Sequence, residues 1–302
     1  MPKIDLSIIT ISYNTKQITL DCLDSILKYT KGISYEVIVV DNGSKDGSVE
    51  AVRHYSKKFP QIILIDAQEN LGFGRGNNLG VKKARGNYLL FLNSDTLLFD
   101  NALKEAYETV IKHPKVGAYS CRLLNADRSF QASGGHFPSF WSLMAWQFFI
   151  DDLPIIGDFI PSFHPKQSQY EKNKQMDWVT GAFMIVRKDI FDKAGGFDKN
   201  IFMYTEEMEL CYRLSKLGYP TYYTNTPAIV HLGGASGGSY LALTLEIKNM
   251  IYFWRKHMPH WQIVFVKISF WTGSLLRLLI FGIIKGDAKA RKAYFHALGF
   301  IF

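Results

Sequence analysis

Two acidic residues in the first third of the sequence directly follow short apolar runs. Asp41 follows Val37–Val40, and Asp95 closes the triplet Asn93-Ser94-Asp95 after Tyr88–Leu92. A carboxylate at the end of a buried strand can accept hydrogen bonds from a base or ribose, or hold a divalent cation that bridges a diphosphate. For Asp41 alone, capping of a strand-to-helix turn explains the pattern equally well.

A second acidic group lies farther along the chain, where Glu206, Glu207 and Glu209 fall within four positions. Glu206 and Glu209 share a face of the predicted helix, and Arg213 follows Glu209 at the spacing of a helical ion pair. Glu207 points elsewhere and is free for catalysis. Crowding by other carboxylates raises a carboxyl pKa, which suits a general base. The alternative is an acidic first turn that the helix dipole stabilises.

Glycine alternates with polar and aromatic residues in Glu69–Asn78 (ENLGFGRGNN). Glycines such as Gly72 would let the backbone approach a nucleotide, and Arg75 could meet a phosphate. The segment lacks the GxGxxG spacing and follows the third apolar run rather than the first. On its own, it is better interpreted as a flexible turn.

Positioning these residues requires an alternating α/β arrangement. Apolar runs predict strands and helical periodicity predicts helices in turn, which favours a mostly parallel sheet with helices on both faces. Ligands of such sheets bind at the carboxyl ends of the strands, where Asp41 and Asp95 stand. Farther along, we expect a strand at 178–186, a helix at 204–217 and an irregular flap or acceptor-side loop at 137–172. The earlier expected strands are 6–12, 37–40, 62–65 and 88–92, and the helices are 15–28, 47–57 and 74–84.

Charge is concentrated at the C-terminal end. From Lys248 onward the sequence has nine Lys or Arg and one acid, Asp287, so this segment carries the whole formal net charge of +8. We therefore expect two parts, a catalytic domain at 1–240 and a basic, aromatic, helical tail at 241–302. A neutral body argues against a nucleic-acid-binding surface and favours an anionic partner at one end. Three widely spaced cysteines favour a reducing compartment, and no signal peptide is evident at the start.

The tail contains one long apolar segment, Trp261–Ile284. It is long enough to span a bilayer, but Lys267 and Arg277 would each cost about 2.5–3.5 kcal/mol near the centre of a spanning helix. We therefore expect helices that lie in the interface of an anionic membrane. The alternatives are packing on the catalytic domain and a homo-oligomer contact.

Six segments together resemble the family 2 inverting glycosyltransferases of GT-A fold, especially their bacterial rhamnosyltransferase-like branch. They occur in family order over about residues 4–231, and the tail lies outside them. The segments are SIITISYN, VIVVDNGSKDGS, ENLGFGRGNN, YLLFLNSD, WVTGAFMIVRKDIFDKAGGFD and FMYTEEMELCYR.

The resemblance implies a donor site built from the first four segments. Asp41 matches the acid that contacts the nucleoside, and Asn70, Gly72 and Arg75 would also contact the donor. Asn93-Ser94-Asp95 matches the family's DxD-type motif, with Asp95 as a ligand of Mg²⁺ or Mn²⁺. Asn93 departs from the aspartate usual at the first position, which weakens the expected metal binding.

The resemblance assigns the remaining roles to later residues. Glu207 matches the catalytic base, although the family usually has aspartate there, so Glu206 and Glu209 remain alternatives. His231 matches a histidine that completes the metal site, with a structural role as the equally weighted alternative. Residues of the acceptor side or behind the site are Gly181, Ala182, Glu206, Glu209 and Arg213.

The activity implied is a single displacement that inverts the anomeric centre of a dTDP- or UDP-sugar, with a lean towards dTDP-L-rhamnose. The expected acceptor is a glycan or polyprenyl-linked glycan used in bacterial cell-surface polysaccharide synthesis. The expected location is the cytoplasmic face of the bacterial inner membrane, peripherally bound. A nucleotidyltransferase is disfavoured because Ser12-Tyr13-Asn14-Thr15 replaces its glycine- and lysine-rich loop. A non-catalytic nucleotide-sugar-binding module is the other alternative.

Overall fold

The structure is a computed structural model that describes residues 4–153, 165, 167–233 and 239–302. Part of the expected loop at 137–172, and Gly234 after His231, therefore lie outside the described residues. The chain forms two compact units. Unit 1 consists of residues 1–135, 166–202 and 206–236, and unit 2 consists of residues 136–165, 203–205 and 237–302.

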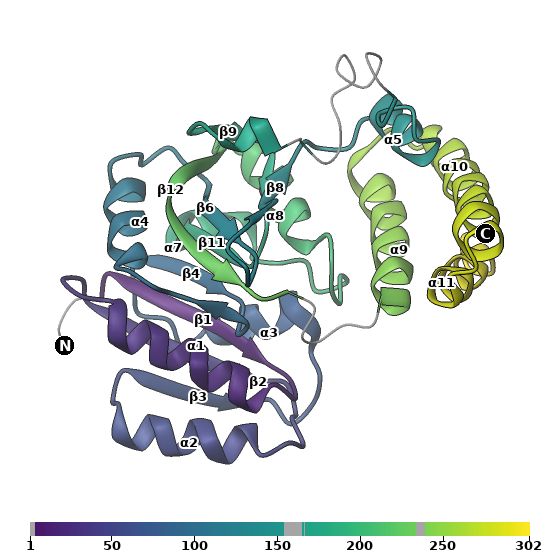
Figure 1. The fold of residues 1–302 in the computed structure, drawn as a ribbon. Coiled ribbons are helices and arrows are strands. Elements are labelled where there is room, and N and C mark those ends of the chain that lie inside the picture. Colours follow the sequence, from purple (N-terminus) through teal and green to yellow (C-terminus); the bar gives the residue numbers. More distant parts are fainter. Residues whose placement is uncertain (1–3, 154–164, 166, 234–238) are drawn as a thin grey trace. The chain divides into compact units, whose positions relative to one another are not determined.

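Unit 1 is built on one mixed sheet, whose first half is parallel (Figure 1). The strand order is β3-β2-β1-β4-β11-β6-β12-β5, and the first four strands pair in parallel. Strand β11 runs antiparallel between β4 and β6, and β12 is again parallel to β6. The predicted α/β class and mostly parallel sheet are confirmed.

Helices cover both faces of this sheet because the strands are apolar on both faces, as in other buried parallel sheets. Helices α1 and α4 pack against Leu6, Ile8 and Val39 in one core. On the other face, α3 packs on Ile9, and α7 packs on Phe91. The first strands and helices are β1 Leu6–Ser12, α1 Lys16–Tyr29, β2 Tyr35–Asp41, α2 Ser48–Lys58, β3 Ile62–Asp66, α3 Gly72–Val81, β4 Tyr88–Leu92, β5 Thr96–Leu97 and α4 Ala102–Ile111. The later ones are β6 Ala118–Leu124, β7 Phe130–Gln131, β8 Gly134–Gly135, η1 Gln167–Tyr170, β9 Lys174–Met176, β10 Trp178–Val179, β11 Phe183–Arg187, α7 Lys188–Ala194, α8 Glu206–Lys216 and β12 Thr221–His231.

The strand expected at 178–186 is two strands in two sheets. Strand β10 pairs with β8, whereas β11 pairs with β4 and β6. The chain breaks between them because the Thr180 N–H donates to the Ser133 carbonyl and the Ala182 carbonyl accepts from the Asn93 N–H. An apolar run alone could not locate this break, because the contacts that cause it come from distant segments.

Unit 2 contains a helix where the sequence predicted an irregular loop. Helix α5, Phe140–Gln147, begins at a capping box in which the Ser139 and Ser142 side chains each bond to the other residue's backbone N–H. The other helices that the structure describes in unit 2 are α9 Ser239–His257, α10 Gln262–Arg277, the π-helical segment η2 Leu278–Ile284 and α11 Ala288–Leu298.

Candidate active site

Asp41 ends strand β2 as a fully buried carboxylate. Its Oδ1 accepts a hydrogen bond from the Ser44 N–H at 2.7 Å. Its Oδ2 is also buried and has no hydrogen-bond partner among the described residues. Because buried polar atoms are almost always paired, this oxygen is well placed to accept a hydrogen bond from a ligand.

Asn70 and Gly72 shape the turn beside Asp41. The Asn42 side-chain amide donates to the Gly72 carbonyl at 3.1 Å, and the Gly72 N–H donates to Asn70 Oδ1 at 3.0 Å. Gly72 has φ of +75°, and a Cβ there would lie 2.0 Å from the Phe202 carbonyl oxygen. Only glycine therefore fits at this position.

The glycine-rich segment Glu69–Asn78 is mostly helical, so its interpretation as a flexible turn was wrong. Helix α3 begins at Gly72, two residues earlier than predicted. A Cβ at Gly80 would lie 2.6 Å from Cγ2 of Ile9, so this glycine lets the helix approach the sheet closely. Arg75 is exposed and its Nε donates to the Leu71 carbonyl. Its contact with a phosphate remains a prediction.

Asp95 and His231 meet after strand β4, at the end of β12. Asp95 Oδ1 lies 3.3 Å from His231 Nε2, and the side-chain nitrogen of Asn93 lies 3.2 Å from the same ring nitrogen. Ser94 and Asp95 are each only 9% exposed. The Leu232 N–H donates to the Asp95 carbonyl, which fixes the two segments together.

Gln131, which the sequence analysis missed, sets the orientation of the His231 ring. Its amide nitrogen donates to Asn125 Oδ1 at 2.9 Å and to the His231 carbonyl at 3.2 Å. Its Oε1 therefore faces His231 Nδ1 at 2.7 Å and accepts a hydrogen bond from it. With the proton on Nδ1, the lone pair of Nε2 points towards Asp95, an arrangement common for metal-binding histidines.

The arrangement of Asp95 and His231 suits a divalent cation. Two ligands in adjacent positions of one octahedral ion are separated by about 3 Å when each lies about 2.1 Å from it. The 3.3 Å between the Asp95 and His231 atoms is close to that separation. No group of three or more Asp, Glu, His or Cys residues that could hold a metal occurs in the described part of the chain. An ion here would therefore need further oxygen ligands, which a diphosphate provides.

The three glutamates of α8 have different surroundings. Glu209 is fully buried and accepts hydrogen bonds from Arg213, whose Nη2 lies 2.6 Å from its Oε2. Arg213 also donates to the Gly196 carbonyl at 2.7 Å. The predicted ion pair is therefore present, and it ties Glu209 to the packing of α8 rather than to solvent.

Glu206 and Glu207 are the other two, and each has a raised pKa. Burial is the main cause for both, and the charge of Glu207 raises the pKa of Glu206 further. Hydrogen bonds from its own backbone N–H and that of Gly181 oppose the rise for Glu207. Ionisation is therefore disfavoured at both carboxyls, and Glu206 is the more deeply buried of the two. Crowding, the cause expected from the sequence, is secondary to burial.

The dipeptide Gly181-Ala182 joins the two acidic groups. The Gly181 N–H donates to the Glu207 carboxyl, and the Ala182 carbonyl accepts from the Asn93 N–H at 3.1 Å. A Cβ on Gly181 would lie 2.7 Å from the ring of Phe73, which follows Gly72 in the chain. Within unit 1, the structure thus links the acidic triplet 93–95, the glutamates at 206–209 and the glycine-rich segment 69–78 at one edge of the sheet.

Two residues immediately before α8 have left-handed backbone conformations. Tyr204 and Thr205 have φ of +66° and +78°, which is costly for residues with a Cβ. The Asn249 side chain donates to the Met203 and Tyr204 carbonyls at 2.7 and 2.8 Å. Such strain is found most often beside functional residues, and here it directly precedes Glu206 and Glu207 in the chain.

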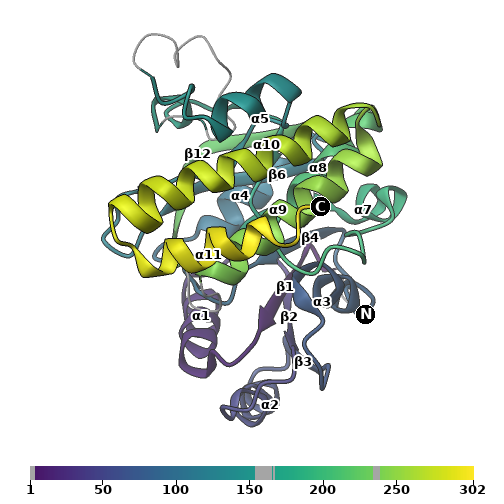
Figure 2. The same cartoon turned by 90° about the vertical axis from the view of Figure 1, so that its right-hand side faces the viewer.

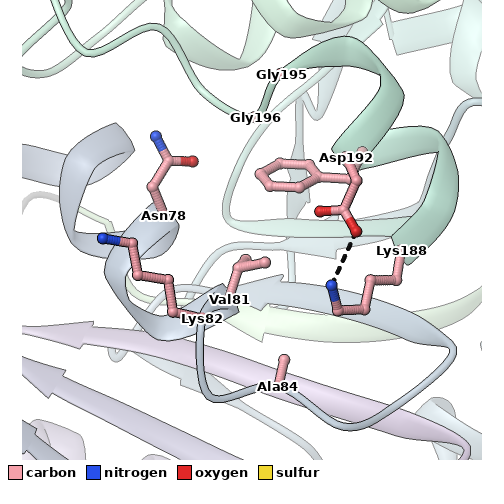
Figure 3. Close-up of a pocket in the computed structure, with 9 residues that line it drawn as sticks. Asn78, Val81, Lys82, Ala84, Lys188, Asp192, Gly195 and Gly196 are labelled. Atoms are coloured by element: carbon pink, nitrogen blue, oxygen red, sulfur yellow. Dashed lines mark hydrogen bonds and ion pairs between the residues drawn. The ribbon is translucent and has the colours of Figure 1, made fainter.

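A hollow of about 360 Å³ in unit 1 lies away from these residues (Figure 3). It lies between α3 and α7, and the Lys188–Asp192 ion pair, at 2.9 Å, forms part of its lining. Lys188 follows the end of β11, next to the start of β4 at Tyr88. The hollow is therefore at the edge where parallel strands begin, opposite to the edge where such sheets bind ligands.

Comparison with known proteins identifies the family. The family model described as glycosyl transferase family 2 matches residues 7–195. The chain is 30% identical over 223 residues to "Rhamnosyltransferase WbbL" of Escherichia coli K12, covering 69% of this chain and 76% of that protein. It is 24% identical over 249 residues to the "N-acetylglucosaminyl-diphospho-decaprenol L-rhamnosyltransferase" of Mycobacterium tuberculosis, covering 75% of this chain and 76% of that protein.

Solved structures share the fold at low sequence identity. GalNAc-T7 with UDP, GalNAc and Mn²⁺ matches 84% of this chain and 48% of its own, with a TM-score of 0.62 and 15% identity. A Pyrobaculum calidifontis mannosyltransferase in complex with GDP-Man and Mn²⁺ matches 100% of this chain and 85% of its own, with a TM-score of 0.59 and 17% identity. These findings favour neither a nucleotidyltransferase nor a binding module, and the chain belongs to glycosyl transferase family 2 as a glycosyltransferase of the rhamnosyltransferase-like kind.

Proposed function

We propose that this protein transfers L-rhamnose from dTDP-L-rhamnose to a hydroxyl of a polyprenyl-diphosphate-linked glycan, with inversion at the anomeric carbon. The observation that carries the proposal is the match to two rhamnosyltransferases over more than two thirds of the chain. The name of the mycobacterial relative includes a decaprenol-linked acceptor, and a Myxococcus xanthus relative is named as an O-antigen biosynthesis protein. These names support a lipid-linked acceptor and a role in cell-surface polysaccharide synthesis.

In this proposal, Glu207 is the general base. Its carboxylate takes the proton of the acceptor hydroxyl while that oxygen attacks the anomeric carbon, and the bond from that carbon to the diphosphate breaks. A pKa raised by burial suits this role because it brings the carboxyl closer to neutral pH. The Gly181 N–H holds the carboxyl in place through its hydrogen bond. Burial and the neighbouring Glu207 disfavour the ionised form of Glu206, and Glu209 is paired with Arg213.

In this proposal, the nucleotide-sugar donor binds beside Asp95 and His231 and beside Asp41 at the end of β2. Asp95 and His231 are the residues that would hold Mg²⁺ or Mn²⁺, and such an ion stabilises the negative charge of the leaving diphosphate. Asp41, with its unpaired Oδ2, would accept a hydrogen bond from the nucleoside. Asn70, Gly72 and Arg75 would line the donor, with Asn93 and Ser94 beside the metal ligands.

We also propose that the protein is bound peripherally at the cytoplasmic face of a bacterial inner membrane, where polyprenyl-linked acceptors are accessible. Among the described residues, one helical stretch, Gln262–Ile284, is long and apolar enough to cross a membrane, with a mean hydropathy of 1.7. The organisms of the relatives and the decaprenol in one of their names support a bacterial membrane setting.

A donor panel tests the proposed reaction. Purified protein with Mn²⁺ is incubated with dTDP-L-rhamnose, UDP-glucose, UDP-N-acetylglucosamine or GDP-mannose, and with polyprenyl-diphosphate-linked N-acetylglucosamine as acceptor. We expect a new lipid-linked disaccharide with dTDP-L-rhamnose and little product with the others. Transfer from a UDP-sugar in preference to dTDP-L-rhamnose would overturn the donor assignment and leave the glycosyltransferase assignment intact.

A further inference from the structure

The helical stretch α10–η2 in unit 2 has the reverse of the usual surface pattern. In a soluble protein, an amphipathic helix turns its apolar residues inward and its polar residues outward. Here Ser269, Ser274 and Arg277 are buried and Lys267 is half-buried. Every exposed residue from 261 to 284 is apolar: Trp261, Val264, Phe265, Ile268, Trp271, Leu279, Ile283 and Ile284.

Helix α5 continues this apolar surface. The Phe140 ring packs at a tilt against Trp261 and edge-to-face against Phe265, with ring centroids 6.2 and 6.4 Å apart. Trp141, next to it, is 78% exposed. After the helix, Phe148, Ile150 and Leu153 are exposed as well. The surface therefore combines two segments more than a hundred residues apart in the sequence.

Arg277 locks the two segments together. Its guanidinium donates to the Gln147 carbonyl at 2.6 Å and to the Trp146 carbonyl at 2.7 Å, at the C-terminal end of α5. Gly273 lets the helices approach, since a Cβ there would lie 2.1 Å from Gln147 Oε1. The arginine that would be costly near the centre of a spanning helix thus faces inward and donates to carbonyls in the last turn of α5.

A basic helix borders the apolar surface. Helix α11 lies alongside α10 (Figure 2), and it exposes Lys289, Arg291 and Lys292, with Lys285 just before it. The one acid after residue 257 is Asp287, which caps α11 by accepting from the Lys289 and Ala290 N–H groups at 2.8 and 3.1 Å. The surface is thus apolar in the middle and positive at its border.

We propose that the exposed side chains of α5, α10 and η2, bordered by α11, form a docking face that lies flat in an anionic lipid surface. This apolar face with a basic border matches a bilayer, which presents phosphates above hydrocarbon. A second copy of the chain fits less well, because a symmetric contact would bring two positive borders together. Such docking would bring the active site close to the lipid-linked acceptor, and this purpose rests on the proposed function. Vesicle binding itself is measured without any sugar transfer, so it can fail or succeed independently of that function.

The packing of α5 also favours a flat position over a spanning one. Helix α5 follows α10 from Phe140 near Trp261 to Gln147 near Arg277. If Gln262–Ile284 crossed the bilayer, this short helix and the non-helical segment after it, with exposed Asp152, would have to enter the hydrocarbon. Backbone groups outside a helix or barrel are not tolerated in contact with lipid there.

Vesicle flotation tests the face with matched variants. Wild-type protein should float with phosphatidylcholine–phosphatidylglycerol vesicles at low salt, and less with pure phosphatidylcholine or at high salt. Ile268→Glu on α10 and Trp141→Glu on α5 should each lower partitioning by about tenfold or more. Ile111→Glu in unit 1 is the control, because Ile111 is 41% exposed and Ile268 is 45% exposed. Circular dichroism and thermal melting show that each variant folds.

The outcomes separate the alternatives. Wild-type flotation of Trp141→Glu would remove α5 from the face, and wild-type flotation of both variants would overturn the proposal. Loss of a dimer by Ile268→Glu in gel filtration, with vesicle binding unchanged, would assign the face to a second copy instead. Donor-dependent sugar transfer to a short soluble acceptor should persist in both variants, so that its loss would point to the active site.

Cysteine labelling distinguishes a flat helix from a spanning one. The three native cysteines are buried and give little background. His260→Cys and Ala288→Cys place reactive thiols at exposed positions before and after Gln262–Ile284. In sealed inverted membrane vesicles from expressing cells, a membrane-impermeant maleimide should label both positions equally. Protection of one of them until detergent is added would show a span and overturn the flat arrangement.

Discussion

The start of α8 and the meeting point of β4 and β12 both gather acidic residues, but their surroundings differ. At the start of α8, burial leaves Glu206 and Glu207 with raised pKa values and few compensating bonds. At the β4–β12 edge, Asp95 faces a histidine that Gln131 orients through a chain of side-chain hydrogen bonds. The first setting suits a group that exchanges a proton, and the second suits a rigid pair that holds a cation. The predictions below test this difference.

Removing the proposed base should have the largest effect. Glu207→Gln keeps the size of the side chain but cannot take a proton, so transfer should fall by about 10²–10⁴-fold. Binding of dTDP with Mn²⁺ should be nearly unchanged. Steady-state transfer assays and calorimetry measure the two quantities on the same preparation. Wild-type turnover by Glu207→Gln would move the role to another residue.

Removing the proposed metal ligand should act on binding instead. Asp95→Ala should weaken the binding of dTDP in the presence of Mn²⁺ by about a hundredfold or more. This loss is larger than the loss of affinity expected when a residue that only positions a metal ligand is removed. Asp66→Ala is the control, because Asp66 ends strand β3 of the same sheet but is exposed and pairs with Arg53 at 3.9 Å. Equal affinities of Asp95→Ala and wild type would rule out Asp95 as a ligand.

Gln131 should contribute to Mn²⁺ binding as Asp95 does, but by a smaller factor. Gln131→Ala frees the His231 ring to rotate or change tautomer, so Mn²⁺ affinity should fall by about 10–100-fold. The electron paramagnetic resonance signal of free Mn²⁺ in a titration with dTDP present measures this without any turnover. Gln131→Glu keeps an acceptor for Nδ1–H and should recover part of the affinity. An unchanged affinity in Gln131→Ala would reduce Gln131 to a packing role.

Glu206→Gln should change activity least. If Glu206 is protonated in the native protein, a neutral amide replaces it closely, and transfer should fall by less than about tenfold, well short of the loss of a base. Stability should respond to pH. A buried acid with a raised pKa favours folding while protonated and opposes it as pH rises above the ordinary glutamate value of 4.5.

The pH dependence of stability separates Glu206 from its neighbour. Thermal melting of Glu206→Gln should match wild type at acidic pH and exceed it at mildly alkaline pH, by about 2–4 °C for each 1 kcal/mol relieved. A melting temperature of Glu206→Gln below that of wild type at alkaline pH would mean that the fold stabilises the ionised form of Glu206.

For Glu207, the acidic limb of the kcat/KM profile should lie above pH 4.5, because the base must be deprotonated and burial raises its pKa.

The sequence predicted those features of the molecule that follow from local patterns. The strand that ends in Asp41, the strand before Asn93 and the Glu209–Arg213 pair depend on apolar runs and helical spacing, and the structure contains all of them. The break at Thr180–Ala182 depends on bonds to Ser133 and Asn93, which no local pattern encodes.

Two other misses have the same origin. Gln131 lies in a two-residue strand, and its importance comes from His231, a hundred residues later. The inward position of Arg277 depends on its bonds to the Trp146 and Gln147 carbonyls of α5, a helix that the aromatic, proline-rich sequence of its region concealed. Long-range hydrogen bonds therefore account for most of what the sequence analysis missed in the site and in the tail.

The most direct test of the central claim compares Glu207→Gln and Asp95→Ala in two assays. The first assay is calorimetric binding of dTDP with Mn²⁺, and the second is transfer from dTDP-L-rhamnose to a lipid-linked acceptor. We predict that Glu207→Gln binds dTDP like wild type but transfers about 10²–10⁴-fold more slowly, whereas Asp95→Ala is impaired in both assays. Transfer at the wild-type rate by Glu207→Gln, or wild-type dTDP binding by Asp95→Ala, would contradict the assignment of proton transfer to one group and cation binding to the other.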